Sequence, residues 1–157
     1  MWQDEVSVDI DADRSLVWSL VSDVSRMGEW SPVCRRVEYL DGATTPAEGV
    51  RFLGHNRQFG ARWSRTCVIT ACAPGRELAF HTLFRDKVGT RWRYRLEPRD
   101  GATRVVESYE LVAMPRWVKA FQRLPGMTSR SRLETNRGMQ RTLSRIKAAA
   151  ESGHVAA

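Results

Sequence analysis

The sequence predicts a single α+β domain in which an antiparallel sheet packs against a long C-terminal helix. Period-two alternation of apolar and polar residues recurs in short segments between residues 37 and 112, as is typical of strands. Apolar residues recur every three or four positions at 16–24 and 117–150, which is typical of amphipathic helices. The 157 residues suit one domain, expected to span 1–151, with a flexible tail at 152–157.

The N-terminal segment predicts a strand followed by a helix. Residues 6–10 alternate between apolar and polar side chains, and Asp11 or Asp13 can cap the helix that follows. Gly28 is expected to end this helical region, and Pro32 to prevent its resumption. The helix presents one apolar stripe, formed by Leu16, Val17, Leu20, Val21 and Val24.

The middle of the chain predicts five or six further strands joined by short polar turns. Asp-Gly or Pro-Gly pairs mark turns at 41–42, 74–75 and 100–101. Successive strands with such short connections pair antiparallel. The alternating segments are 37–39, 50–55, 61–72, 78–81, 91–96 and 103–112.

The C-terminal segment predicts a long amphipathic helix that starts near Pro115 and is interrupted at 125–126. It is the only segment long enough to cover the apolar face of the predicted sheet. The side chains expected to point toward the sheet are Leu133, Met139, Leu143 and Ile146.

Several classes of protein are disfavoured by the composition. Cys34, Cys67 and Cys72 form neither a disulfide framework nor a paired metal-ligand spacing, which favours reduced thiols and a cytoplasmic location. No apolar run approaches the ~20 residues that cross a bilayer. The acidic, alternating N-terminus does not resemble a signal peptide. No metal and no cofactor are expected.

Positive charge is concentrated in the C-terminal third. The net charge is +7, and residues 116–147 hold nine basic side chains against Glu134 alone. This pattern has two interpretations: a solvated face, or a surface for an anionic membrane or an acidic carrier protein. Nucleic acid is disfavoured because no known nucleic-acid motif is present. The arginines nearest one helix face are Arg130, Arg137, Arg141 and Arg145.

The order of these elements resembles that of the START-like (SRPBCC) superfamily, and most closely its bacterial polyketide cyclase/dehydrase and lipid-transport group. The resemblance spans about residues 4–151. It depends on Trp-Ser-Pro at 30–32 after the first helices, the Pro-Gly turn at 74–75, DGATRV at 100–105 and LSRIKAAAE at 143–151. It implies a helix-grip fold: a curved seven-stranded antiparallel sheet around the last helix, with two short helices after the first strand and a deep apolar cavity.

The resemblance also implies a ligand, because members of this superfamily bind lipids, sterols, polyketides or plant hormones. We therefore expect a hydrophobic or amphiphilic small molecule between the sheet and the last helix. Trp30 would either fold under the short helices and cover the cavity or anchor the core at the helix-to-strand corner. The predicted ligand contacts are Trp30, Phe52, Trp63, Phe80, Trp92, Tyr94, Tyr109 and Met139.

The sequence offers only weak evidence for catalytic residues. The sequence contains no metal-binding HExxH and no G-x-S-x-G. His55 and His81 are out of phase with the apolar sets and are expected to face solvent, and His154 lies in the tail. Arg65 and Glu107 share strand faces with apolar residues, so Glu107 is a candidate general base and Arg65 a candidate anchor for a carboxylate or enolate. Alternatively, bulges shift the strand phase, or the two side chains form a structural ion pair.

Three functional hypotheses follow. The absence of a histidine–acid constellation favours a non-catalytic binding or carrier protein. The second hypothesis is a polyketide cyclase or dehydratase, since a few members of the superfamily catalyse aldol cyclisation or dehydration. Its candidate catalytic residues are Glu107, Arg65 and Tyr109. The third is a lipid-transfer protein that docks on anionic membranes through its basic helix.

Overall fold

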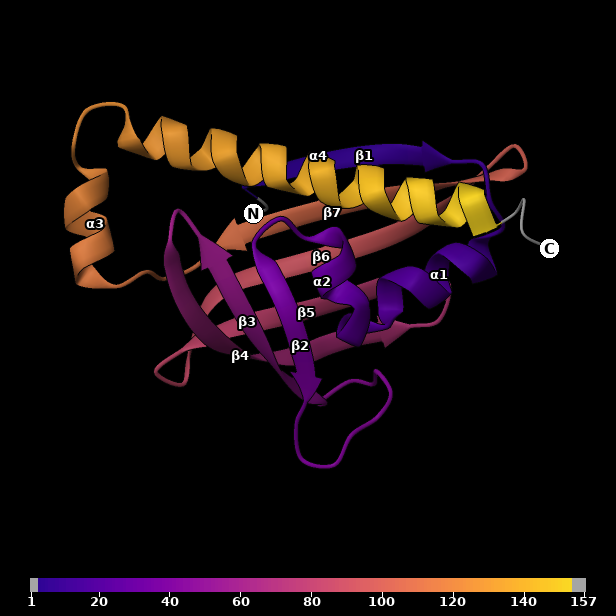
Figure 1. The fold of residues 1–157 in the computed structure, drawn as a ribbon, viewed down its shortest axis with the longest axis horizontal. Helices are drawn as coiled ribbons and strands as arrows, with labels where there is room; N and C mark the ends of the chain where they lie inside the picture. Colours follow the sequence, from indigo (N-terminus) through magenta and orange to yellow (C-terminus); the bar gives the residue numbers. More distant parts are fainter. Residues whose placement is uncertain (1–2, 154–157) are drawn as a thin grey trace.

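The computed structural model describes residues 3–153 (Figure 1). Strands and helices follow in the order expected from the sequence. They are β1 (Asp4–Ile10), α1 (Arg14–Ser22), a 3₁₀ turn η1 (Val24–Arg26), α2 (Met27–Trp30), β2 (Cys34–Tyr39), β3 (Arg51–Gln58), β4 (Ala61–Ala73), β5 (Glu77–Phe84), β6 (Lys87–Arg99), β7 (Ala102–Leu111), α3 (Arg116–Gln122) and α4 (Met127–Gly153).

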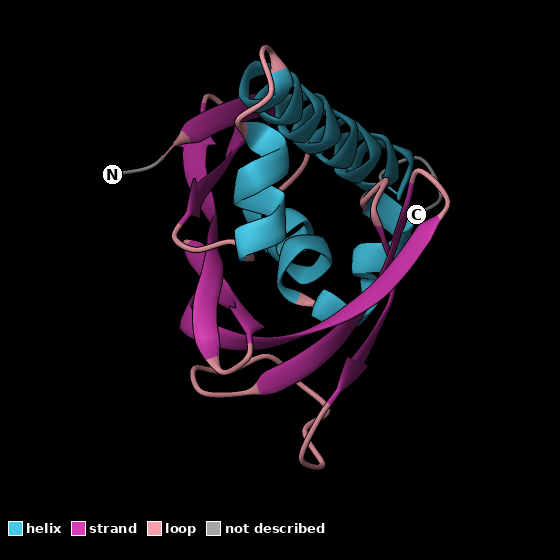
Figure 2. Ribbon diagram, turned by 90° about the vertical axis from the view of Figure 1, so that its left-hand side faces the viewer, coloured by secondary structure: helices cyan, strands magenta, loops and turns pink. Residues whose placement is uncertain are grey.

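The seven strands form one antiparallel sheet in the order β1-β7-β6-β5-β4-β3-β2. The strands from β2 to β7 follow one another as a meander, and β1 pairs with β7 at the edge. Figure 2 shows the sheet curving around the helices. The predicted helix-grip fold is therefore confirmed, including the short helices after the first strand and the interruption between α3 and α4.

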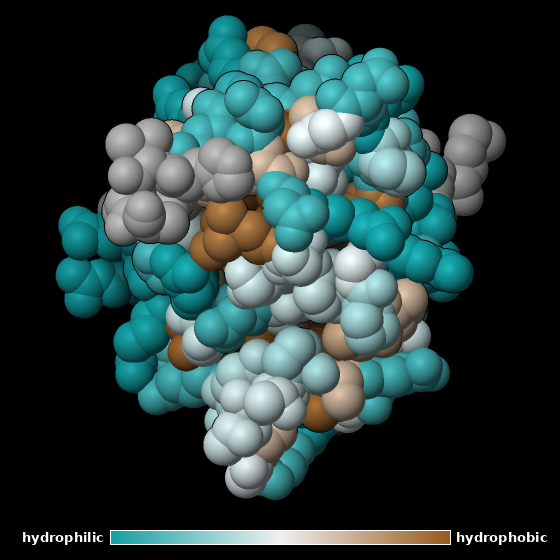
Figure 3. Space-filling model, turned by 90° about the vertical axis from the view of Figure 1, so that its right-hand side faces the viewer, coloured by the Kyte–Doolittle hydropathy of each residue, from teal (hydrophilic) through white to brown (hydrophobic). Residues whose placement is uncertain are grey.

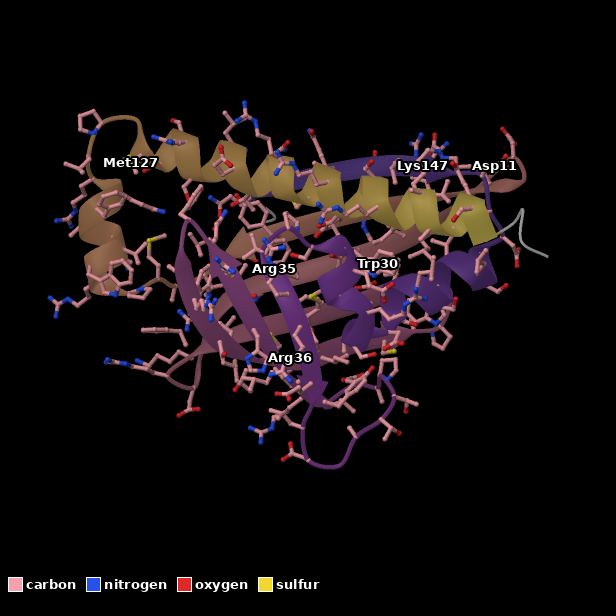
Figure 4. All side chains as sticks on the ribbon, viewed as in Figure 1. Asp11, Trp30, Arg35, Arg36, Met127 and Lys147 are labelled. Carbon is pink, nitrogen blue, oxygen red and sulfur yellow. The ribbon has the colours of Figure 1, made fainter. Side chains whose placement is uncertain are left out.

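The main core lies where α4 meets the sheet. Leu143, Ile146 and Ala150 have at most 2% of their surface exposed and belong to one apolar cluster with Ile10 of β1. Polar contacts at the edge of this packing also fix the helix. Lys147 Nζ donates to the carbonyl of Asp9, 2.9 Å away, and Figure 4 labels Lys147 near Asp11 at this end of α4.

Two details of the sequence prediction are wrong. Leu133 is 49% exposed and does not point toward the sheet. It lies about 120° around the helix from Met139, since successive residues rotate by about 100°. Gly28 does not end the first helix, which stops at Ser22. It lies within α2, where an added Cβ would come within 2.2 Å of the Arg35 carbonyl oxygen, so the glycine permits close contact with β2.

The helix α4 continues to Gly153, two residues into the segment predicted as a tail. The rest of that predicted tail, including His154, lies outside the described residues. No helix in residues 3–153 combines the length and apolarity needed to cross a bilayer.

Candidate functional site

A cavity of about 680 Å³ lies between the concave face of the sheet and the helices α3 and α4. Its walls come from β3 to β7, from the segment between α2 and β2, and from the first half of α4. Figure 2 looks at the α3 end of the molecule, where α3 lies between the sheet and α4. The cavity therefore occupies one end of the grip, next to the packed core.

Most of the predicted ligand contacts line this cavity. Their side chains alternate along the strands, so the concave face collects them on one side. The rings of Phe52 and Phe80 meet edge to face, with centroids 5.3 Å apart. The predicted residues that line the cavity are Phe52, Trp63, Phe80, Trp92, Tyr94 and Met139.

Trp30 and Tyr109, also predicted as ligand contacts, do not line the cavity. Trp30 is 6% exposed within the core, and its carbonyl oxygen accepts a hydrogen bond of 3.1 Å from Arg145 of α4. In Figure 4 it lies well away from Met127, which marks the α3 end of α4. Tyr109 is buried beside Trp92, with ring centroids 5.5 Å apart. Both side chains support the site from within the core.

Glu107 and Tyr94 form a buried polar pair on the sheet side of the cavity. They are direct partners in the β6–β7 register, and the Tyr94 hydroxyl donates a hydrogen bond of 2.8 Å to Glu107 Oε1. Both residues line the cavity, and Glu107 is only 3% exposed. Within the part of the chain that the structure describes, Glu107 Oε2 has no hydrogen-bond partner.

Burial changes the protonation of this pair. Removal from water disfavours the carboxylate and raises the pKa of Glu107 to about 8, although the Tyr94 hydrogen bond acts in the opposite direction. Burial likewise raises the pKa of Tyr94 well above its ordinary value. At neutral pH the cavity therefore contains an uncharged carboxylic acid held by an uncharged phenol.

Arg65 also lines the cavity but is not paired with Glu107. Its Nη1 donates to the carbonyl of Ser64 at 3.1 Å, and its guanidinium lies 5.1 Å from the centre of the Phe84 ring. Among residues 3–153 Arg65 forms no ion pair, so the structural ion pair with Glu107 considered above is absent.

The described histidines lie outside the cavity, as expected. His55 Nε2 is 2.8 Å from Glu38 Oε2, and its Nδ1 is 3.0 Å from the Ser64 hydroxyl. Burial is the main cause that lowers the pKa of His81. No group of three His, Cys, Asp or Glu side chains within residues 3–153 is arranged to hold a metal ion.

Several polar lining residues were missed by the sequence reasoning. Thr82 and Thr90 pair across β5 and β6, and both contribute to the wall. They are in phase with Phe80 and Trp92 on their respective strands, so the same alternation that identified the aromatic residues also contained this signal. The other missed lining residues with polar groups include Asn56, Gln58, Thr135 and Thr142.

The α3 end carries the exposed apolar residues. Phe59, at the turn between β3 and β4, is 85% exposed, and both Phe59 and Phe121 also line the cavity. The opposite end of the molecule is mostly hydrophilic, with apolar residues in small separate areas (Figure 3). Within residues 3–153 the exposed large apolar side chains are Phe59, Val112, Trp117, Phe121, Leu124 and Leu133.

We call Phe59, Trp117, Phe121 and Leu124 the mouth surface. Basic side chains lie among these residues in the sequence and are exposed. Arg130 is exposed as well and lines the cavity. The exposed basic residues on and next to α3 are Arg116, Lys119 and Arg123. Exposed positive charge therefore lies beside the apolar mouth surface.

Solved structures share this architecture. The Polyketide_cyc-like protein Cgl2372 from Corynebacterium glutamicum is 29% identical, with a TM-score of 0.60 over 94% of this chain and 90% of that one. The aromatase/cyclase ZhuI from Streptomyces sp. R1128 is 19% identical, with a TM-score of 0.66 and coverage of 94% and 92%.

A third structure is the di-domain ARO/CYC StfQ from the steffimycin biosynthetic pathway. It is 13% identical, with a TM-score of 0.77, and the match covers 96% of this chain and 51% of StfQ. At such identities, ZhuI and StfQ support the fold alone.

No curated protein matches the sequence. Residues 1–151 match the family model described as polyketide cyclase/dehydrase and lipid transport. The chain therefore belongs to the polyketide cyclase/dehydrase and lipid transport family.

Proposed function

We propose that the protein binds a mostly apolar small molecule in the cavity between the sheet and α4. The observation that carries this proposal is a cavity of about 680 Å³ whose walls are largely aromatic and aliphatic. Ligand sites typically have about 300–1,000 Å³, apolar walls and a few polar groups that fix orientation. The polar groups here include Glu107, Tyr94 and Arg65.

The binding test uses the tryptophans that line the cavity. Trp63 and Trp92 should report an apolar ligand by a change in fluorescence, and a bound ligand should raise the melting temperature. A panel of fatty acids, sterols and aromatic polyketides supplies the probes. Native mass spectrometry of freshly purified protein tests for a ligand that remains bound through purification.

A matched pair of variants separates cavity binding from adsorption to the surface. Thr135→Phe adds a ring to the cavity wall on α4 and should abolish uptake. Gln140→Phe adds the same ring at an exposed position that does not line the cavity and should leave uptake unchanged. Equal uptake by both variants would contradict binding in this cavity.

The second candidate is a cyclase or dehydratase acting on a polyketide-like substrate. Glu107 favours it, because a carboxyl with a pKa of about 8 can exchange protons near neutral pH. The carboxylic acid can protonate a leaving hydroxyl, and the carboxylate can accept a proton from a carbon next to a carbonyl. The aromatase/cyclases ZhuI and StfQ, which share the fold, also support this candidate by analogy. Glu107→Gln should retain binding and lose turnover if the protein is such an enzyme.

The third candidate is a lipid-transfer protein that docks on an anionic membrane. The mouth surface favours it, because exposed aromatic and basic side chains lie at the end of the protein where the cavity is found. Aromatic residues favour the membrane–water interface, and basic residues are attracted to anionic lipids. Vesicle binding, described in the Discussion, tests this candidate.

A further inference from the structure

The unpaired oxygen of Glu107 distinguishes the polar end of the cavity. Oε1 accepts the hydrogen bond from Tyr94, whereas Oε2 is buried without a partner among the described residues. Buried polar atoms nearly always have a partner, so each exception requires an explanation. Since Glu107 lines an open cavity of about 680 Å³, a bound molecule can supply the missing partner.

The Tyr94 hydrogen bond determines which oxygen carries the proton. Oε1 accepts from the Tyr94 hydroxyl, which donates to no other acceptor within residues 3–153, so Oε1 acts as the carbonyl oxygen of the neutral acid. The proton then lies on Oε2. Glu107 therefore presents a hydrogen-bond donor to the cavity and requires an acceptor there.

The charged and titratable groups around Glu107 are consistent with this state. Val6 of β1 is its backbone neighbour on one side, and Tyr94 of β6 is its neighbour on the other. No basic side chain among the described residues forms an ion pair with Glu107, so the Tyr94 hydrogen bond alone favours the carboxylate, and burial outweighs it. The other titratable or charged lining residues are Cys34 of β2, Arg65 and Cys67 of β4, and Arg130 and Glu134 of α4.

We propose that Glu107 Oε2–H donates a hydrogen bond to a carbonyl oxygen of a neutral ligand, with Tyr94 as the positioning residue. This inference rests on the proposed ligand-binding function and narrows its ligand class. The ligand is a mainly apolar ketone or ester whose carbonyl reaches the β6–β7 wall. The lining residues of β6 and β7 include no basic side chain that could compensate a carboxylate at this wall, and an alkane would leave Oε2 without a partner.

The experiment compares a long-chain methyl ketone with the alkane of equal carbon number, measured by tryptophan fluorescence and calorimetry. The wild-type protein should bind the ketone up to about tenfold more tightly than the alkane, because the ketone forms one additional buried hydrogen bond. Glu107→Gln retains an acceptor for Tyr94 and an N–H donor for the ligand, so it should retain the preference. Glu107→Leu should bind both probes equally.

The dependence of this preference on pH separates hydrogen bonding from a structural role. Glu107 loses its donor as the pH rises through its pKa of about 8, so the ketone preference of the wild-type protein should disappear between about pH 7 and 9. The preference of Glu107→Gln should not change over this range. Tyr94→Phe should reduce the preference, because Oε1 then has no donor to fix the orientation of the acid.

The outcomes separate the two proposals. If neither the ketone, the alkane nor the wider panel binds the wild-type protein, the proposed function fails. If ketone and alkane bind equally tightly to the wild-type protein, only the carbonyl proposal is overturned. A preference for the alkylamine of equal length over the ketone would also overturn it, because the amine requires an ionised Glu107.

Discussion

The two halves of α4 lie over the same sheet but have different roles: one packs against it, and the other covers the cavity. The half from 139 to 150 is packed, with Leu143 and Ile146 almost fully buried. The half from 127 to 138 lies over the cavity, which Met139 and Thr142 also line at the boundary with the packed half. The difference follows from side-chain volume, because the first half presents mostly short or polar side chains to the sheet. Its lining residues include Ser131, Thr135 and Gly138. A single helix can thus close a core at one end and leave a ligand cavity at the other.

The largest expected effect comes from removing side-chain volume in the packed half. Leu143→Ala should lower the free energy of unfolding by about 2–5 kcal/mol, because it leaves a cavity in a site that is 2% exposed. Leu133→Ala changes the same residue type on the other half, where the side chain is 49% exposed, and should cost less than about 0.5 kcal/mol. Urea unfolding measures both. Similar losses would show that the two halves are packed alike.

Two glycines provide a second comparison. Gly28→Ala should destabilise the protein by about 1–3 kcal/mol, because the new Cβ would meet the Arg35 carbonyl oxygen at 2.2 Å. Gly138→Ala should stabilise it by up to about 1 kcal/mol, because the helix gains propensity and the nearest atom is Pro32 Cγ at 3.7 Å. Thermal unfolding of the two variants should therefore shift in opposite directions. If Gly138→Ala were instead less stable than the wild-type protein, this half of α4 would have no space for an added methyl group.

Glu107, which lines the cavity, should make the stability of the protein depend on pH. Its pKa is raised from 4.5 to about 8 in the folded protein, so between these values the folded state holds a proton that the unfolded state has lost. The contribution is favourable at low pH and is lost as the pH rises through about 8. Stability should fall by at most about 1.4 kcal/mol per pH unit in this window.

Glu107→Gln lacks this titration and serves as the control. Other carboxyls, such as Asp9 and Glu38 with lowered pKa values, contribute equally to both proteins, so the comparison uses their difference. The wild-type protein should lose stability relative to Glu107→Gln between about pH 5 and 8. A constant difference over this range would mean that Glu107 is already ionised in the folded protein.

The comparison of the two halves extends to membrane docking, where each basic residue contributes little by itself. Changing Arg116, Lys119 and Arg123 to Gln removes charge beside the mouth surface, and should weaken binding to anionic vesicles by about 1 kcal/mol per residue. Changing Arg137 and Arg141 to Gln removes charge from exposed positions farther along α4. Cosedimentation at low and high salt compares the two sets. A larger loss from the second set would assign docking to the helix face, as the charge pattern first suggested.

Phe121→Ser tests the apolar part of the same surface. Phe121 is 53% exposed, so the change should hardly affect folding and should weaken vesicle binding even at high salt. Gln122→Ser, at the next position on α3, is a control for the shortened side chain. Equal binding to neutral and anionic vesicles, or none to either, would leave the basic residues with only a solubilising role.

The strand pattern predicted the sheet and the aromatic side chains that the strands contribute to the cavity wall, because alternation directly reports which side chains share a face. It identified Trp92 and Glu107 in this way. It did not identify Tyr94 as the partner of Glu107, since that requires the register between two strands. The strand pattern also did not distinguish Tyr109 from the lining residues. Alternation shows which side chains point to the concave face, but not which of them are covered by the packed core.

The helix pattern was less informative about exposure. Trp117 and Phe121 have helical spacing, yet no residue of α3 is buried. Periodicity reports a common direction and does not report what lies in that direction. Leu133 differs from the prediction for another reason: it lies about 120° around the helix from Met139, so the two side chains do not share a direction.

The pairing of β1 with β7 makes the two ends of the chain depend on each other during folding. Asp4 is the register partner of Tyr109, and Ile10 that of Thr103. The α4 side chain of Asn136 also donates to Asp4 at 2.9 Å. The first strand of this domain therefore has no partner until the last strand, β7, has been synthesised. Contacts so distant in sequence are slow to form, so the domain should complete its folding only when β1 closes against β7 and α4.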